Sequence, residues 1–122
     1  MKILIVDDSA TMRKIQKTQL SQLGFTDVAE AGNGKQALDV LAENMPVDLI
    51  LLDWNMPEMD GMTFLKSVRS RDEYKSVKIV MCTSESEKSK VIEAMKEGVN
   101  NYIVKPFTPE ILEEKLGLTK GG

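Results

Sequence analysis

The chain has 122 residues, a net charge of −3 and no histidine. This length is typical of one domain spanning residues 1–122, long enough to bury a hydrophobic core. The negative charge argues against nucleic acid as a partner, because phosphate backbones are bound by basic surfaces. The lack of histidine excludes histidine-based catalytic triads and most transition-metal sites, and it means that the chain cannot carry a phosphohistidine of its own.

Nothing in the sequence predicts a membrane partner. No apolar run approaches the roughly 20 residues that span a bilayer, and the first residues lack the cleavage pattern of a signal peptide. The single cysteine, Cys82, excludes an internal disulfide and fits a reducing cytoplasm. Because Cys82 lies in a strand-like apolar run, we expect it to be a buried packing residue.

Five short apolar runs alternate with helical patterns along the chain. The expected strands are residues 2–6, 27–31, 48–52, 78–82 and 101–104. After each strand, apolar residues recur at helical spacing and predict a helix. In chain order, the expected apolar faces of these helices are Met12, Ile15, Leu20 and Leu23; Ala37, Leu38, Leu41 and Ala42; Met62, Leu65 and Val68; Val91, Ile92 and Met95; and Ile111, Leu112 and Leu116.

Start and stop signals bound several of these helices. Gly24 and Gly98 follow two of the patterns as stops, and Asn33-Gly34 is a turn signal before the second helix. Asp60 is an expected N-cap of the third helix. Thr108-Pro109 opens the fifth helix as an N-cap followed by a proline at the first helical position.

The alternation of strand and helix predicts an α/β fold. Continuous apolar runs of four or five residues are typical of strands buried on both faces, as in a parallel sheet covered by helices. Five βα units predict a flavodoxin-like (βα)5 three-layer sandwich with strand order 2-1-3-4-5. In that order the first and third strands are neighbours.

Polar residues follow four of the expected strands. Asp7 and Asp8 come after the first strand and Asp53 after the third. Thr83-Ser84 follows the fourth strand, and Lys105-Pro106 follows the fifth. Parallel strands end at the same edge of a sheet, where open α/β folds bind ligands, so we expect these side chains to converge.

The three aspartates predict a cation site. Carboxylates held close together repel one another, and a divalent hard cation such as Mg²⁺ relieves that repulsion with oxygen ligands. Lys105 brings a compact positive charge to the same edge. The alternative is that the aspartates only begin loops and cap helices, with Asp8 or Ser9 capping the first helix. The combination of residues at four strand ends favours the cation site.

These residues resemble the receiver domain of bacterial response regulators, and the resemblance covers essentially the whole chain. It is greatest to the single-domain chemotaxis regulators of that family, with Asn55 and Glu85 also matching this branch. The matching segments are Asp8-Ser9-Ala10-Thr11-Met12-Arg13-Lys14-Ile15, Asp53-Trp54-Asn55-Met56-Pro57, Asp60-Gly61 and Val104-Lys105-Pro106-Phe107-Thr108.

The resemblance implies a role for each acidic residue. Asp53 is the implied phosphoacceptor, taking a phosphoryl group from the phosphohistidine of a kinase. Asp8 is implied to bind Mg²⁺ directly, Asp7 largely through water, and Asn55 through its backbone carbonyl. Asp53 completes this set of metal ligands.

The resemblance also implies a switch beside the acceptor. Lys105 is implied to pair with the phosphoryl oxygens, with Thr83-Ser84 beside them and Thr83 supplying the switch hydroxyl. Tyr102 is implied to turn inward when Thr83 moves. An aromatic residue of this kind is more often an ordinary half-buried strand residue, but its position after Asn100-Asn101 favours the switch. The Lys105–Pro106 bond is implied to be cis.

Two residues are expected at the rim of the site. Trp54, next to the acceptor, either packs into the loop or forms part of the rim, and the sequence favours neither alternative. Glu85 is expected to line the entrance and to affect how fast water removes the phosphoryl group, although capping of the fourth helix would explain it nearly as well.

The implied protein is a signalling domain and not an enzyme acting on external substrates. Its implied partners are a histidine kinase, a flagellar motor switch protein and a phosphatase, and we expect a cytoplasmic monomer. With no separate output domain expected, the output is binding through the fourth helix, fifth strand and fifth helix, around residues 88–95, 102 and 105–116.

Three alternatives remain, and two of them require other residues at the site. A single-domain receiver in a non-motility phosphorelay would carry the same residues. A Mg²⁺-dependent phosphatase would use Asp53 as its nucleophile, but a second acid is expected two residues on, where this chain has Asn55. A flavodoxin-like cofactor binder would need a phosphate loop after the first strand, where Asp7 and Asp8 would repel the phosphate.

Overall fold

A computed structural model describes residues 1–54, 56, 59–84 and 89–121, without the side chains of residues 118–121. Five parallel strands form one sheet in the order β2-β1-β3-β4-β5. The strands are β1 (Ile3–Val6), β2 (Val28–Ala31), β3 (Leu49–Asp53), β4 (Lys78–Thr83) and β5 (Asn101–Val104). The helices are α1 (Ala10–Gln22), α2 (Gly34–Asn44), α3 (Gly61–Arg69), the 3₁₀ turn η1 (Asp72–Tyr74), α4 (Val91–Lys96) and α5 (Pro109–Gly121).

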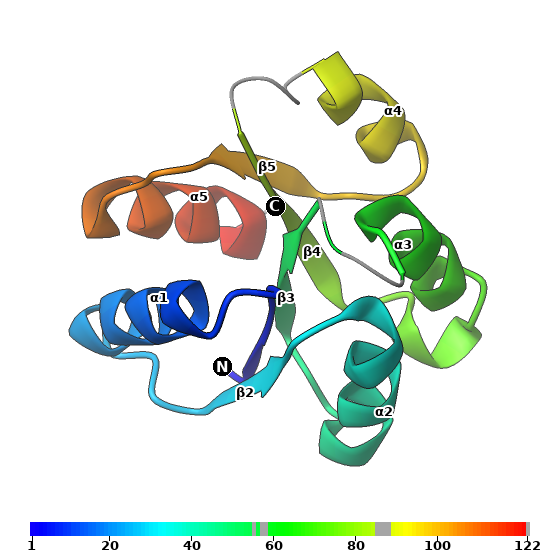
Figure 1. Cartoon of the computed structure of the whole chain (residues 1–122), viewed down its shortest axis with the longest axis horizontal. Helices are drawn as coiled ribbons and strands as arrows, with labels where there is room; N and C mark the ends of the chain where they lie inside the picture. The colour runs from blue at the N-terminus through cyan, green and yellow to red at the C-terminus, as the bar shows by residue number, and fades with distance from the viewer. Residues whose placement is uncertain (55, 57–58, 85–88, 122) are drawn as a thin grey trace.

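The helices cover both faces of the sheet and make three layers (Figure 1). Figure 1 shows α1 and α5 on one side of the strands and α2, α3 and α4 on the other. Because successive side chains of a strand point to opposite faces, each strand contributes to both cores. Ile3 and Ile5 pack with Leu20 of α1 and Leu112 of α5. The adjoining strand residues, such as Leu4, pack on the other side with α2, α3 and α4. The flavodoxin-like (βα)5 fold predicted from the sequence is confirmed.

The predicted caps and stops are also confirmed. The Asp60 carboxylate accepts a hydrogen bond from the Thr63 amide at 2.9 Å, and the Thr108 hydroxyl accepts one from the Ile111 amide at 3.2 Å. These bonds satisfy amides that have no partner within the first turn of a helix. Gly24 and Gly98 adopt φ angles of 92° and 115°, a conformation that residues other than glycine rarely adopt.

Four of the predicted apolar faces are partly wrong. Ala42 of the face predicted for α2 and Ile111 of the face predicted for α5 are exposed. On α1 the buried residues are Gln16 and Leu20, whereas Ile15 is 46% exposed. On α4 the buried residues are Val91 and Ala94, and Ile92 and Met95 are exposed instead. Adjacent residues on a helix point about 100° apart, so the rotation of a helix about its own axis decides which of two neighbours is buried, Gln16 in place of Ile15 on α1 and Val91 in place of Ile92 on α4.

None of the helices within the described part of the chain is both long enough and apolar enough to span a bilayer.

The rotation of α1 predicts that two substitutions on that helix lower the free energy of unfolding by unequal amounts. Leu20→Ala removes a fully buried side chain and should lower the free energy of unfolding by about 2–5 kcal/mol. Ile15→Ala removes a largely exposed side chain and should change it by no more than about 0.5–1 kcal/mol. Urea unfolding of the two variants and the parent measures this contrast. Equal costs would contradict the observed packing of α1.

Candidate functional site

The strand register brings the predicted site residues to one edge of the sheet. Val6 pairs with Leu52, so Asp7 and Asp53, the residues that follow them, lie side by side on neighbouring strands. On the other side of β3, Asp53 pairs with Cys82, the residue before Thr83. The edge is closed by a backbone hydrogen bond of 2.7 Å from the Lys105 amide to the Thr83 carbonyl.

The three aspartates form the acidic cluster of Asp7, Asp8 and Asp53. One carboxylate oxygen from each lies within 4.8 Å of the others. Asp7 and Asp53 are only 1% and 8% exposed, whereas Asp8 is exposed. Buried carboxylates are stable only when they are paired or hydrogen-bonded, so the cluster needs a nearby cation.

Lys105 supplies positive charge to the cluster. Its ammonium Nζ lies 3.0 Å from Asp7 Oδ2 and 3.2 Å from Asp53 Oδ1. Burial alone would lower the pKa of Lys105, but the charges of Asp53 and Asp7 and the hydrogen bond to Asp7 outweigh burial and raise it above the ordinary value of 10.5. Lys105 is therefore charged at neutral pH and held between the two buried carboxylates.

The capping alternative for Asp8 is wrong, because Ser9 caps α1. The Ser9 hydroxyl accepts a hydrogen bond from the Met12 amide at 3.1 Å. Asp7 Oδ1 in turn accepts one from the Ser9 amide at 2.9 Å. The carboxylate of Asp8 does not serve as the N-cap and lies in the acidic cluster.

The donor set fits a hard divalent cation. Carboxylate oxygens are the ligands that Mg²⁺ prefers, and Mg²⁺ commonly uses one or two protein carboxylates together with waters. Asp7 already accepts hydrogen bonds on both of its oxygens, from the Ser9 amide and from Lys105. Exposed Asp8 has more room for direct coordination.

Thr83 and Tyr102 lie near each other on one face of the sheet. Thr83 pairs with Val104, and Met81 pairs with Tyr102, so the two residues are diagonal neighbours on adjoining strands. Thr83 is buried, and its hydroxyl donates to the carbonyl of half-buried Ser84 at 3.2 Å. Tyr102 is half-buried, with the ammonium of Lys115 4.5 Å from its ring centroid.

Trp54 packs into the protein interior. Its side chain is buried, and a Cβ added to Gly61 would lie 2.5 Å from its ring. The Gly61 amide also donates to the Trp54 carbonyl at 3.2 Å, which closes the base of the loop after β3. These contacts favour loop packing, one of the two alternatives that the sequence left open for Trp54.

Two predicted site residues, Asn55 and Glu85, lie outside the described residues. The Lys105–Pro106 peptide bond is cis. The Met45–Pro46 bond is also cis, and no feature of the sequence predicted this.

Sequence reasoning missed one residue at the site, Arg13. Its guanidinium Nη1 donates to the backbone carbonyl of Asp7 at 2.6 Å. The contact could not be found from the sequence, because a basic residue in a helix usually faces solvent.

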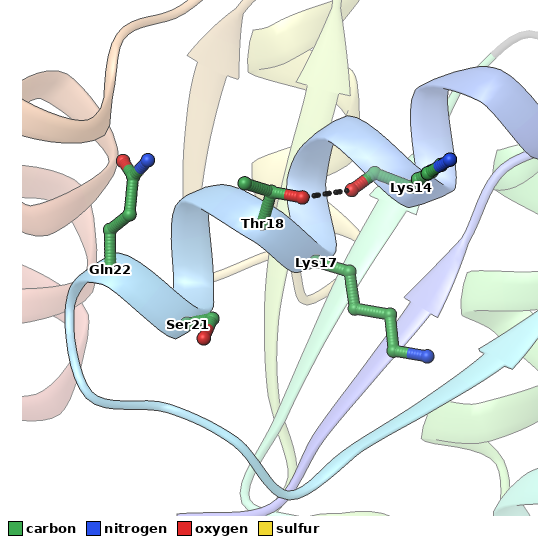
Figure 2. A pocket seen from close by; sticks show the side chains of 5 residues that line it. All are labelled: Lys14, Lys17, Thr18, Ser21 and Gln22. Atoms are coloured by element: carbon green, nitrogen blue, oxygen red, sulfur yellow. Dashed lines mark hydrogen bonds between the residues drawn. The ribbon is translucent and has the colours of Figure 1, made fainter.

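A shallow hollow on the outer surface of α1 lies apart from this edge. It is lined by Lys14, Lys17, Thr18, Ser21 and Gln22, which all come from one helix (Figure 2). The hydrogen bond drawn there is local, from the Thr18 hydroxyl to the Lys14 carbonyl at 3.0 Å. With no second element among its lining residues, the hollow does not compete with the sheet edge as a candidate site.

The raised pKa of Lys105 predicts how the pairing depends on pH. A cation with a raised folded-state pKa stabilises the fold fully below its unfolded-state pKa, and this stabilisation is lost as the pH rises through the folded-state pKa. The difference in unfolding free energy between the parent and Lys105→Met should therefore be constant from about pH 7 to pH 9 and shrink above about pH 10.5. Urea unfolding in metal-free buffer measures it. Lys14→Met, which removes an exposed lysine, is the control and should show no such change; a difference that stayed constant or widened for Lys105→Met would contradict the pairing.

Curated proteins similar to this chain include chemotaxis proteins. The chain is 53% identical over 116 residues to a chemotaxis protein CheY homolog of Campylobacter jejuni, which covers 95% of this chain and 89% of that protein. It is 52% identical over 121 residues to chemotaxis protein CheY1 of Helicobacter pylori, which covers 99% and 98%.

Solved structures share the fold. Chemotaxis response regulator CheY4 of Vibrio cholerae has a TM-score of 0.86 and 37% identity, covering 97% of both chains. A probable two-component system response regulator/GGDEF domain protein has a TM-score of 0.91 and 28% identity; the match covers 99% of this chain, which spans about half (49%) of that longer chain. The family model of the response regulator receiver domain matches residues 3–117, and the chain belongs to that family.

Proposed function

We propose that this protein is a phosphorylation-activated response regulator that accepts a phosphoryl group on Asp53. The observation that carries the proposal is the arrangement of Lys105, whose ammonium lies between Asp7 and Asp53 beside the acidic cluster. Phosphoryl transfer needs positioning and charge neutralisation more than covalent help from the protein. This edge of the sheet combines a carboxylate acceptor, a cation and a set of hard oxygen ligands.

In the proposed reaction, a carboxylate oxygen of Asp53 attacks the phosphorus of a phosphohistidine on a partner kinase. The new O–P bond forms as the N–P bond to the histidine breaks, and the histidine leaves with the electron pair of that bond. The chain contains no histidine, so the donor has to be another protein or a small phosphodonor. The product is an acyl phosphate on Asp53.

Asp8, Asp53 and Asp7 are the residues that would hold Mg²⁺, with Asn55 contributing its backbone carbonyl as the family resemblance implies. Bound there, Mg²⁺ supplies charge neutralisation for the transferred group. The acidic cluster supports this assignment, since its oxygens converge within 4.8 Å. Lys105 provides the second positive charge and orients toward the acceptor.

The switch begins with a change in what Lys105 and Thr83 contact. A phosphoryl group adds roughly two negative charges, enough to form new hydrogen bonds with an ammonium and a hydroxyl. Lys105 then shifts from its carboxylates to the phosphoryl oxygens, and the Thr83 hydroxyl exchanges the Ser84 carbonyl for a phosphoryl oxygen. Tyr102 responds because it is the diagonal neighbour of Thr83 on the same face of the sheet.

The proposed output surface comprises α4, β5 and α5. Among its described residues it has three exposed apolar side chains, Ile92 and Met95 on α4 and Ile111 on α5, the helices before and after the edge strand that carries Tyr102. Exposed apolar residues on a signalling domain favour a protein-binding role. By similarity to chemotaxis proteins, we propose a histidine kinase as donor, the flagellar motor switch as target and a phosphatase as the partner that ends the signal. The same chemistry in a non-motility phosphorelay is the alternative.

Asp53→Asn should abolish phosphorylation and leave the fold intact, because an amide oxygen is a poor nucleophile but fills the same space. Incubation with acetyl phosphate and Mg²⁺, followed by intact-protein mass spectrometry, should detect a phosphorylated parent and no phosphorylated variant. Chelation of the metal should suppress labelling of the parent.

Asp60→Asn is the matched control for this experiment. Asp60 lies after the same strand but caps α3, and asparagine is an equally good N-cap. This variant should be labelled like the parent. Labelling of Asp53→Asn at the parent's level would show that Asp53 is not the acceptor.

A further inference from the structure

Arg13 ties three elements together beside the acidic cluster. It comes from α1, and its Nη1 donates to the backbone carbonyl of Asp7, after β1, at 2.6 Å. Its Nε lies 3.2 Å from Glu30 Oε1, on β2. A planar guanidinium presents its N–H donors in a rigid fork, so it can hold these two acceptors in a fixed geometry.

The Asp7 carbonyl belongs to the peptide unit that joins Asp7 to Asp8. Backbone amides on both sides of this peptide unit are also hydrogen-bonded. The Asp7 amide donates to the Ala31 carbonyl at 3.1 Å, and the Ser9 amide donates to Asp7 Oδ1 at 2.9 Å. Because a peptide unit is planar, holding its oxygen also sets the direction in which the chain leaves toward Asp8. Asp8 is exposed, so its place in the cluster depends on the direction of the backbone that carries it.

We propose that Arg13 is a positioning residue that acts through the Asp7 carbonyl to hold Asp8 in the acidic cluster and so strengthens divalent-cation binding. The inference rests on the proposed function, because it requires that the cluster binds a cation.

The surroundings of Arg13 keep its guanidinium in place. Glu30 also pairs with Lys17, whose Nζ lies 3.1 Å from Glu30 Oε2. Figure 2 shows Lys17 extending from α1. The hydrogen bond from Lys17, together with the charges of Lys17 and Arg13, outweighs partial burial and lowers the pKa of Glu30, so this anchor stays ionised. The backbone at Gly32 passes close by, since a Cβ built there would lie 3.5 Å from Arg13 Nη1.

Positioning and simple electrostatics predict opposite effects of removing Arg13. A positive charge near a cation site repels the cation, so its removal should tighten binding if charge is all that matters. If Arg13 positions Asp8, its removal should weaken binding despite the lost repulsion. Changes in groups that orient metal ligands commonly cost 10–100-fold in metal affinity.

The test is a titration of the full chain with Mn²⁺, followed by the loss of the free-ion EPR signal and competed with Mg²⁺. Arg13→Met should bind Mn²⁺ and Mg²⁺ about 10-fold more weakly than the parent. Lys17→Met is the matched control. Like Arg13→Met, it removes one positive charge from α1 and one ion pair with Glu30. Unlike Arg13, however, Lys17 makes no hydrogen bond to the Asp7 carbonyl. This variant should bind as tightly as the parent or slightly more tightly.

Circular dichroism and urea unfolding without metal establish that each variant is folded. If Arg13→Met is not folded, Arg13→Lys replaces it, and a smaller loss of affinity in the same direction is expected. Unchanged or tighter binding by the folded Arg13 variant, or an equal loss in Lys17→Met, would overturn the positioning role while leaving the proposed function intact. A parent that binds neither ion would overturn the cation site and this inference together.

Discussion

The main constraint on this structure is that two buried carboxylates, Asp7 and Asp53, lie at the ends of adjacent parallel strands. Without a cation, these two negative charges would destabilise the edge of the sheet, because they lie close together and water does not screen their repulsion well. Lys105 meets this requirement from the far side of the sheet, reaching both carboxylates from the end of β5. The strand order makes this reach feasible, since β1 and β3 are neighbours and the backbone of Lys105, just after β5, is hydrogen-bonded to the end of β4.

The same constraint explains how a chemical event at Asp53 would reach the surface of the molecule. A backbone hydrogen bond of 2.7 Å joins Lys105 to Thr83 and holds the ends of β4 and β5 together. Thr83 and Tyr102 share a face of the sheet as diagonal neighbours. Under the proposed function, a new anion on Asp53 changes the partners of a buried cation and a buried hydroxyl, and the edge strand β5 carries that change toward α4 and α5.

The sequence was sufficient to predict the fold and the residues that meet at the sheet edge. Strand burial on both faces leaves continuous apolar runs, and parallel strands end at one edge, so the positions of Asp7, Asp53 and Lys105 follow from topology. The sequence could not set the rotation of a helix on the sheet, and Ile15 was therefore placed in the core where Gln16 is found. It could not reveal Arg13 either, because the acceptor is a backbone carbonyl, which carries no side-chain signal.

Cation binding and phosphorylation must be coupled under the proposed function. A phosphoryl group enters a site that already holds three carboxylates and one ammonium, and it meets like charge unless a divalent cation is present. If the phosphorylated form binds the cation more tightly than the free form does, then the bound cation favours phosphorylation by the same factor, because the coupling between two ligands is reciprocal. The position of Asp8 then matters twice. A contact that holds this carboxylate in the cluster strengthens cation binding directly and, through the cation, favours the phosphorylated state, so a residue such as Arg13 can influence the switch without contacting the phosphoryl group.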